Sequence, residues 1–265
     1  MYAFNYVRPQ SVADAVAALG ANAEAKLLAG GQTLLPTIKQ RLAKPSVVVD
    51  LGAVPELKGI QKSGNAIGIG AMTTHATVAA NADVRASIPG LAHLAGGIGD
   101  PAVRNAGTIG GSLANNDPAA CYPAAVLALN ATIVTNKRQM SADQFFNGMF
   151  TTALEHGEII TGVGFSIPTK SGYAKFEQRA SRYAMVGVFV AQTAAGVRVA
   201  VTGCGSNGVF RVPALEAELA KNFSVDAVAK VDVDPATLMG DMHGSAEYRA
   251  HLIRIMAARA IEAAK

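Results

Sequence analysis

Two pairs of adjacent glycines, Gly30-Gly31 and Gly110-Gly111, constrain this chain of 265 residues more than any other feature. Each pair stands between apolar residues and a stretch with helical spacing, so each predicts a loop that leads into a helix. Glycine lets the backbone approach a neighbour or a ligand closely and present its N–H groups. A helix that begins beside such a loop adds a favourable dipole for an anion. The two loops together therefore favour a site for a diphosphate.

Hydroxyl side chains beside both glycine loops add donors for the same purpose. Thr33 follows the first pair, and Thr108 and Ser112 flank the second. Neither loop contains the lysine of a nucleotide-hydrolysing P-loop, so the pattern disfavours phosphate transfer. A chain with 27 glycines also contains ordinary tight turns, and composition alone leaves that interpretation open for both pairs.

Composition and charge disfavour several classes of function. The net charge is +4, but the 23 basic residues are dispersed, which argues against nucleic acid binding. No segment approaches the roughly eighteen apolar residues of a membrane span, and the N-terminus lacks a basic stretch followed by an apolar run. We therefore expect a cytoplasmic protein. Cys121 and Cys204 show no CxxC spacing, so we expect no iron–sulfur cluster on this chain's own thiols.

The apolar periodicity predicts an α/β chain whose organisation changes near Pro168. The last helix is expected to present Leu252, Ile255 and Met256 on one apolar face. Helices are predicted over residues 12–20, 34–42, 89–96, 117–129, 213–220 and 246–264. Strands are predicted over 26–28, 47–51, 66–71, 131–135 and 197–202.

Several motifs that carry chemistry in other proteins are interpreted as structural here. The run Gly203 to Gly208 matches GxGxxG, but the residues after it are β-prone, so we expect a turn and no Rossmann site. The five histidines are scattered without metal-ligand spacing, and no nucleophile elbow is present. Glu155 and Glu158 are expected in a solvated turn. Cys121 has no positive charge beside it in sequence, so we expect a small packed residue.

Two long stretches around the glycine pairs resemble the signatures of a known family. The similarity extends to residues 4–9, 70–75 and 240–249, and so covers essentially the whole chain. The chain resembles the FAD-binding medium subunit of the molybdenum hydroxylases, the family of xanthine dehydrogenase and aerobic carbon monoxide dehydrogenase. The two stretches are Leu28-Ala29-Gly30-Gly31-Gln32-Thr33-Leu34-Leu35-Pro36 and Arg104-Asn105-Ala106-Gly107-Thr108-Ile109-Gly110-Gly111-Ser112-Leu113-Ala114-Asn115-Asn116-Asp117-Pro118-Ala119-Ala120.

The resemblance implies an α/β (α+β) fold and a division into domains. Residues 1–168 would form a two-subdomain FAD-binding unit of the PCMH or vanillyl-alcohol-oxidase type, with subdomains of about 1–55 and 56–168. Residues 169–265 would form a small α/β sandwich, similar to the C-terminal domain of carbon monoxide dehydrogenase flavoproteins.

The resemblance also implies a function, an electron-transfer subunit that carries FAD. Electrons would come from [2Fe–2S] clusters in a small partner subunit and leave to an external acceptor. A molybdopterin cofactor would belong to a large subunit, in a dimer of heterotrimers. No residue would act as a catalytic acid or base, and the substrate and acceptor stay open. The FAD-contacting positions implied are Leu28, Ala29, Gly30, Gly31, Gln32, Thr33, Leu34, Ile98, Thr108, Ile109, Gly110, Gly111, Ser112, Cys121, Ile160 and Tyr183.

Some positions depart from the family's pattern. Cys121 stands where the family usually has aspartate, and a thiol accepts a hydrogen bond from a ribose hydroxyl less well than a carboxylate does. Gln32 replaces a histidine or asparagine, and Arg182 an acidic residue. The hairpin over residues 136–140 is shorter than usual. Two alternatives stay open: a self-sufficient FAD oxidase, for which the tail after Pro168 is short, and a scaffold subunit that has lost FAD.

Overall fold

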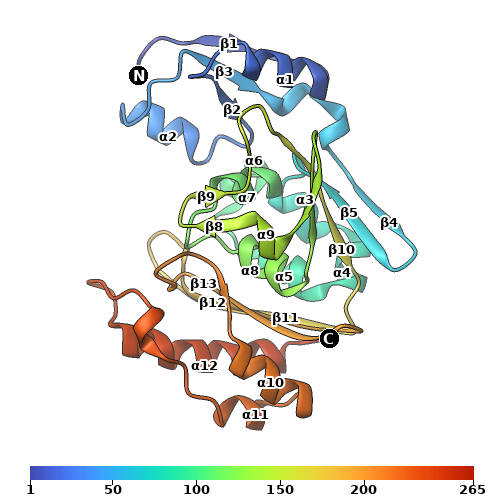
Figure 1. Ribbon diagram of the computed structural model, residues 1–265, viewed down its shortest axis with the longest axis vertical. Helices are drawn as coiled ribbons and strands as arrows, with labels where there is room; N and C mark the ends of the chain where they lie inside the picture. The colour runs from blue at the N-terminus through green and yellow to red at the C-terminus, as the bar shows by residue number, and fades with distance from the viewer.

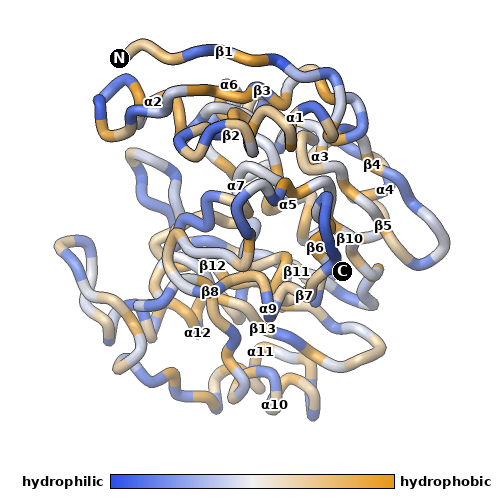
Figure 2. Tube along the Cα trace, turned by 45° about the horizontal axis from the view of Figure 1, so that its top comes forward, coloured by the Kyte–Doolittle hydropathy of each residue, from blue (hydrophilic) through white to orange (hydrophobic).

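The computed structural model describes residues 1–265 and arranges them in three layers along the long axis of the molecule (Figure 1). The three main sheets follow the chain in order, with strand orders β1-β3-β2, β4-β5-β10-β6-β7 and β11-β12-β13-β14. Helices accompany every sheet, so the α/β (α+β) class expected from the sequence is confirmed. In Figure 2 the exposed strand β4 carries hydrophilic stretches, in agreement with its solvent-facing residues.

The first layer is a small parallel sheet with two helices. Strand β3 lies between β1 and β2 and pairs with both in parallel. Ser11 caps the first helix by accepting a hydrogen bond from the N–H of Asp14. The second helix is shorter than predicted and leaves Leu42 exposed. The elements are β1 (Asn5–Val7), α1 (Val12–Gly20), β2 (Lys26–Leu28), α2 (Leu34–Lys39) and β3 (Val47–Asp50).

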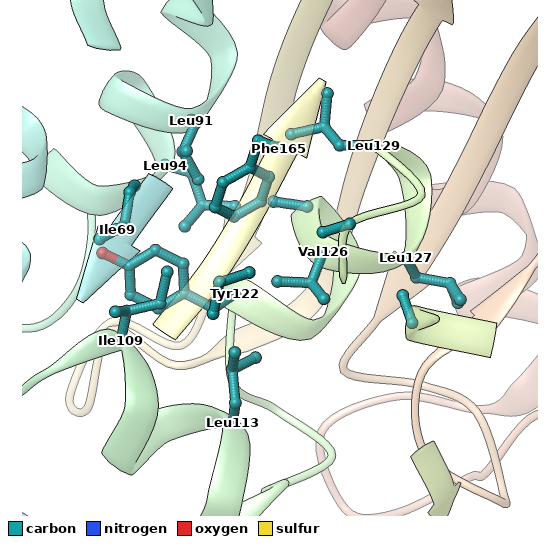
Figure 3. Close-up of a cluster of buried hydrophobic side chains, with 14 of the residues drawn as sticks. Ile69, Leu91, Leu94, Ile109, Leu113, Tyr122, Val126, Leu127, Leu129 and Phe165 are labelled. Carbon is teal, nitrogen blue, oxygen red and sulfur yellow. The ribbon is translucent and has the colours of Figure 1, made fainter. Parts of the chain in front are cut away.

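The second layer is an antiparallel sheet covered by a group of short helices. Its core gathers the rings of Tyr122 and Phe165 with Leu91, Leu94 and Ile109 (Figure 3), all of which are shielded from solvent. The strands are β4 (Ile60–Ser63), β5 (Ala66–Gly70), β6 (Thr132–Thr135), β7 (Gln139–Ser141) and β10 (Ile160–Ser166), with a separate hairpin of β8 (Phe146–Gly148) and β9 (Thr151–Thr152). The helices are α3 (His75–Ala80), α4 (Ala82–Ser87), α5 (Pro89–Gly96), α6 (Pro101–Ala106), α7 (Ile109–Asn115), α8 (Tyr122–Ala128) and α9 (Ala142–Phe145).

The second glycine pair corrects one sequence-based expectation in this layer. Residues 107–112 were expected to form a loop before a helix over 117–129, but Ile109–Asn115 is itself helix α7 and the next helix begins only at Tyr122. The reason is Thr108, whose hydroxyl accepts the N–H of Gly111 and so caps a helix that contains both glycines.

The third layer is an antiparallel meander covered on both faces. Strand β12 is buried along most of its length, because α12 packs on one side of the sheet while α5 and α8 pack on the other (Figure 1). Leu252 and Met256 face this core as expected, but Ile255 is partly exposed. The elements are β11 (Lys170–Glu177), β12 (Ala184–Thr193), β13 (Gly196–Thr202), β14 (Phe210–Arg211), α10 (Pro213–Lys221), α11 (Val225–Ala229) and α12 (Ala246–Glu262).

The GxGxxG match after β13 forms a turn rather than a nucleotide loop. The chain passes from residues 203–208 into the short strand β14, and the next helix begins at Pro213. A Rossmann site needs a helix that opens directly at the third glycine. The turn expected from the sequence is confirmed.

Candidate cofactor cleft

A cleft of about 660 Å³ is lined by residues from all three layers. This volume lies within the ~300–1,000 Å³ that is typical of cofactor and small-molecule sites. Ile109 and Leu28 do not line it: Ile109 lies in the core of the second layer (Figure 3), and Leu28 packs beneath the first glycine loop. The other predicted contact residues all line it, namely Ala29, Gly30, Gly31, Gln32, Thr33, Leu34, Ile98, Thr108, Gly110, Gly111, Ser112, Cys121, Ile160 and Tyr183.

The first glycine loop presents a row of free donors to the cleft. It runs from the end of β2 to the start of α2, and no protein group accepts the backbone N–H of Gly30, Gly31, Gln32 or Thr33. Gly31 has φ of 71°, a left-handed conformation that glycine adopts without steric cost. Successive free N–H groups in such a turn form a concave site for an anion. This loop therefore has the donors that a diphosphate requires.

The N–H groups around the second glycine pair are already used within the protein. The N–H of Ile109 donates to Thr73 O at 3.1 Å, and the N–H of Gly110 donates to Ala71 O at 2.8 Å. The N–H of Gly111 donates to the Thr108 hydroxyl at 3.1 Å. In contrast, the Ser112 hydroxyl lines the cleft and has no protein partner. Ser112 is therefore the donor that this segment offers to a ligand.

Close packing explains why glycine is needed in the second segment. A Cβ on Gly110 would stand 2.7 Å from Ala71 O, so only glycine lets α7 approach the end of β5 this closely. The two glycine segments also contact each other. A Cβ on Gly30 would stand 2.1 Å from Ala106 O, and one on Gly111 would stand 3.1 Å from Ala29 Cβ. Together the segments form a continuous floor for the cleft.

His75 lines the cleft beneath this floor, a position that the sequence analysis did not assign to the site. It begins α3 after the Thr74 cap, and its backbone N–H donates to Gly107 O at 3.0 Å. Burial, assisted by the charge of Arg104, lowers the pKa of His75 to about 4. The imidazole is therefore neutral at neutral pH and supports the floor as an uncharged ring.

Glu158 corrects the expectation of a solvated turn. Glu155 is exposed, but the Glu158 side chain is fully buried and pairs with Arg138 at 3.0 Å. Its carboxylate also accepts hydrogen bonds from Thr135 and from the N–H of Glu155. The hydrogen bond from Arg138 is the main cause that lowers the pKa of Glu158 to about 2. This ion pair fixes the chain just before Ile160, which lines the cleft.

Cys121 is buried at the edge of the cleft, as expected for a packed residue, but it has a cationic neighbour. The Nζ of Lys175 lies 3.9 Å from its sulfur, although the two residues are far apart in sequence. Burial raises the pKa of the Cys121 thiol, and the charge of Lys175 opposes that shift. The thiol is therefore protonated at neutral pH. The lysine could not be predicted beside Cys121 from the sequence, because only the folding of strand β11 brings it there.

The arrangement fits a dinucleotide cofactor such as FAD. The free amides of the first loop suit a diphosphate, the Ser112 hydroxyl adds a donor, and Ile98, Ile160 and Tyr183 supply apolar and aromatic surface. No group of histidine, cysteine or carboxylate side chains could hold a metal ion. None of the helices is long and apolar enough to cross a membrane.

Comparison with known proteins gives a consistent result. Residues 2–170 match the family model described as the FAD binding domain in molybdopterin dehydrogenase. The chain is 38% identical to the nicotine 6-hydroxylase medium subunit of Paenarthrobacter nicotinovorans, over 98% of this chain and 96% of the relative. It is 36% identical to the carbon monoxide dehydrogenase medium chain of Hydrogenophaga pseudoflava, over the same shares of each.

Solved structures agree with these sequence relatives. The fold superimposes on a chain of reconstituted CO dehydrogenase from Oligotropha carboxidovorans with a TM-score of 0.90 and 32% identity, over 99% of this chain and 97% of that one. A chain of quinoline 2-oxidoreductase from Pseudomonas putida 86 gives a TM-score of 0.88 and 29% identity, over 99% and 97%.

Proposed function

This chain belongs to the FAD-binding medium subunits of the molybdenum hydroxylases, and on that premise we propose that it relays electrons through FAD in a multi-subunit oxidoreductase. FAD, when bound, can take up electrons one at a time and pass on two, which is the redox chemistry that the relay requires. The residues of this chain bind and orient the cofactor and shield it from solvent.

The first glycine loop binds the diphosphate in this proposal. The N–H groups of Gly30, Gly31, Gln32 and Thr33 donate to its oxygens, because they have no acceptor within the protein. The Ser112 hydroxyl donates from the opposite segment. Further contacts are proposed for Ala29, Leu34, Ile98, Thr108, Gly110, Gly111, Cys121, Ile160 and Tyr183, all of which line the cleft. Leu28 and Ile109 act indirectly, by packing beneath the floor.

The partners follow from the names of the relatives, which are medium subunits or chains of larger enzymes. A small subunit with [2Fe–2S] clusters supplies the electrons in this proposal, and a large subunit with the molybdenum cofactor oxidises the substrate. This chain has no cysteine cluster of its own, in keeping with that division. The complex would be a dimer of heterotrimers that delivers electrons to an external acceptor.

The domain limits belong to the same proposal. Residues 1–168 form the FAD-binding domain, with subdomains of about 1–55 and 56–168, and residues 169–265 form the C-terminal domain. The change of sheet between β10, which ends at Ser166, and β11, which begins at Lys170, supports this division. The C-terminal domain contributes Tyr183 to the cleft through the β11–β12 hairpin.

The observation that carries the proposal is the row of four free amide groups at the floor of the cleft. The test is a titration of FAD with the full-length chain, followed by flavin fluorescence and visible absorption. We expect saturable binding with a flavin spectrum, and reduction of that flavin by substrate in the presence of the co-purified partner subunits. A chain that stays colourless with added FAD would instead be a scaffold that has lost the cofactor. A chain that reduces its flavin with a substrate on its own would be an oxidase.

A further inference from the structure

A short strap of backbone, residues Gly97–Gly99, forms one edge of the cleft and is held by three cationic side chains. Ile98 and Gly99 line the cleft itself. Lys175 Nζ donates to Gly97 O at 2.8 Å. Arg104 Nη1 donates to Ile98 O at 3.0 Å and to Gly99 O at 2.8 Å, and Arg182 Nη1 donates to Gly99 O at 3.3 Å. Each of the three successive carbonyls therefore has a cationic donor.

Lys175 differs from the two arginines because it joins several parts of the cleft. It lies on β11 in the third layer, and its side chain is only 7% exposed. Besides Gly97 O, its Nζ donates to Arg182 O at 2.8 Å and lies 3.9 Å from Cys121 Sγ. The strap, the residue before α8 and the β11–β12 hairpin thus meet at one ammonium group, and all three segments line the cleft.

The charge of Lys175 is only partly compensated within the protein. Its one carboxylate neighbour is Glu177, at 3.7 Å, and that side chain is about half exposed. An ammonium group has three donors, and two of them reach carbonyls. The third faces the Cys121 thiol and the Glu177 carboxylate, of which the thiol is a weak acceptor. The residue at position 121 therefore contributes to how firmly this ammonium is held.

We propose that Lys175 is a positioning residue for FAD, which fixes the strap, the Cys121 segment and the hairpin in the arrangement that binds the cofactor. The proposal rests on the FAD site proposed above. Besides its own contact with FAD, position 121 acts on the cofactor through Lys175, so that the C-terminal domain and the cofactor are coupled at one side chain.

The first test compares three lysine variants of the full-length chain. Lys175→Met keeps the alkyl stem but removes the positive charge and its N–H donors, whereas Lys175→Arg keeps a positive charge and N–H donors on a guanidinium group. Lys170→Met is the matched control, because Lys170 begins the same strand and contacts Phe223 away from the cleft. We expect FAD dissociation constants about tenfold higher for Lys175→Met, as for one lost charged hydrogen bond, and nearly unchanged for the other two.

Thermal unfolding of the FAD-free variants separates positioning from general stability. Lys175→Met leaves no buried charge without a partner, because Glu177 is half exposed, but Gly97 O and Arg182 O each lose a donor. We therefore expect a small decrease in the unfolding midpoint of Lys175→Met, together with weakened FAD binding at temperatures where the variant is fully folded. Equal FAD affinity in Lys175→Met and wild type overturns the proposal, and so does a loss that Lys175→Arg fails to restore.

A double-mutant cycle with Cys121→Asp tests the second statement. Beside Lys175 the new carboxylate completes an ion pair, so we expect tighter FAD binding in the wild-type background. In the Lys175→Met background the same carboxylate is buried without a partner, and we expect weaker binding. An equal effect of Cys121→Asp in both backgrounds overturns the coupling. A wild-type chain that binds no FAD overturns the proposed function itself, and this proposal with it.

Discussion

The two glycine pairs are identical in sequence, but glycine is needed in each for a different physical reason. In the first, Gly31 adopts a left-handed conformation and the neighbouring N–H groups stay free to face the cleft. In the second, both glycines lie in the first turn of α7, their N–H groups are used within the protein, and Gly110 packs against Ala71. One pair presents donors, and the other allows two segments of backbone to approach closely.

The difference shows that a Gly-Gly motif does not identify its own role. Both pairs line the same cleft and belong to segments that contact each other, so their position alone does not distinguish them. The hydrogen bonds of their backbone N–H groups distinguish the two pairs, because a buried or half-buried N–H either has an acceptor in the protein or is available to a ligand. Substitution of Gly31 in the first pair should therefore weaken FAD binding, whereas substitution of Gly110 in the second pair should impair folding.

The largest effect is expected from Gly110→Val. Its Cβ would stand 2.6 Å from Ala71 Cβ and 2.7 Å from Ala71 O, and a clash with backbone cannot be relieved by a side-chain rotation. Helix α7 then cannot dock on β5, and we expect loss of soluble folded protein, measured by circular dichroism and gel filtration. Gly20→Val is the control, since nothing lies within 4 Å of its added Cβ. A folded Gly110→Val protein that merely loses FAD would contradict the packing role.

Acid should weaken the second segment more than the first, because His75 lies beneath it. The pKa of His75 falls from 6.5 to about 4 in the folded protein, so the unfolded chain takes up a proton first as the pH falls. The contribution of neutral His75 to the free energy of unfolding should therefore be fully present above pH 6.5. It should decline between pH 6.5 and 4, by up to about 3 kcal/mol at about 1.36 kcal/mol per pH unit. Denaturant unfolding across this range measures the decline.

A His75→Gln variant supplies the comparison for this pH dependence. Glutamine does not titrate, so the slope of stability against pH between 6.5 and 4 should become flatter than in the wild type. If the two proteins keep the same slope, His75 is not the group responsible.

Gly31→Ala should separate FAD binding from folding in the first loop. A left-handed conformation costs a residue with a Cβ about 1–2 kcal/mol, and the nearest neighbour is the flexible side chain of Leu35. We expect a folded protein whose FAD dissociation constant rises about tenfold, because the free N–H groups are redirected. Gly64→Ala, also at positive φ but in the β4–β5 turn with open space around it, should lose stability without changing FAD affinity.

The smallest effects are expected from the hydroxyl groups around the second pair. Removal of one hydroxyl should lower stability, whereas removal of the other should lower FAD affinity. Thr108→Val removes the cap of α7 and leaves the N–H of Gly111 unpaired, which should cost about 1 kcal/mol of stability. Ser112→Ala removes a hydroxyl with no protein partner, so stability should be unchanged while FAD affinity falls a fewfold. Thermal unfolding and FAD titration of both variants give the comparison, and a destabilised Ser112→Ala would argue against a ligand role for Ser112.

Local patterns predicted much of the fold. Helix α1 and strands β2, β3 and β13 lie close to their expected positions, because caps, glycines and apolar periodicity act over a few residues. The limits of α7 and α8 differ from expectation because Thr108 caps a helix that contains two glycines, which propensity alone disfavours. Ile255 was expected on the buried face of α12, but it lies on the exposed side of the helix, in line with His251 and Arg259.

The sequence by itself determined the family, the two glycine segments and fourteen of the 34 residues that line the cleft, since these depend largely on contiguous motifs. Only the tertiary structure decided which glycine pair keeps free N–H groups, that Glu158 is buried against Arg138, and that Lys175 reaches Cys121. These outcomes depend on partners far apart along the chain, and burial and hydrogen bonding between such partners exist only once the layers have packed together.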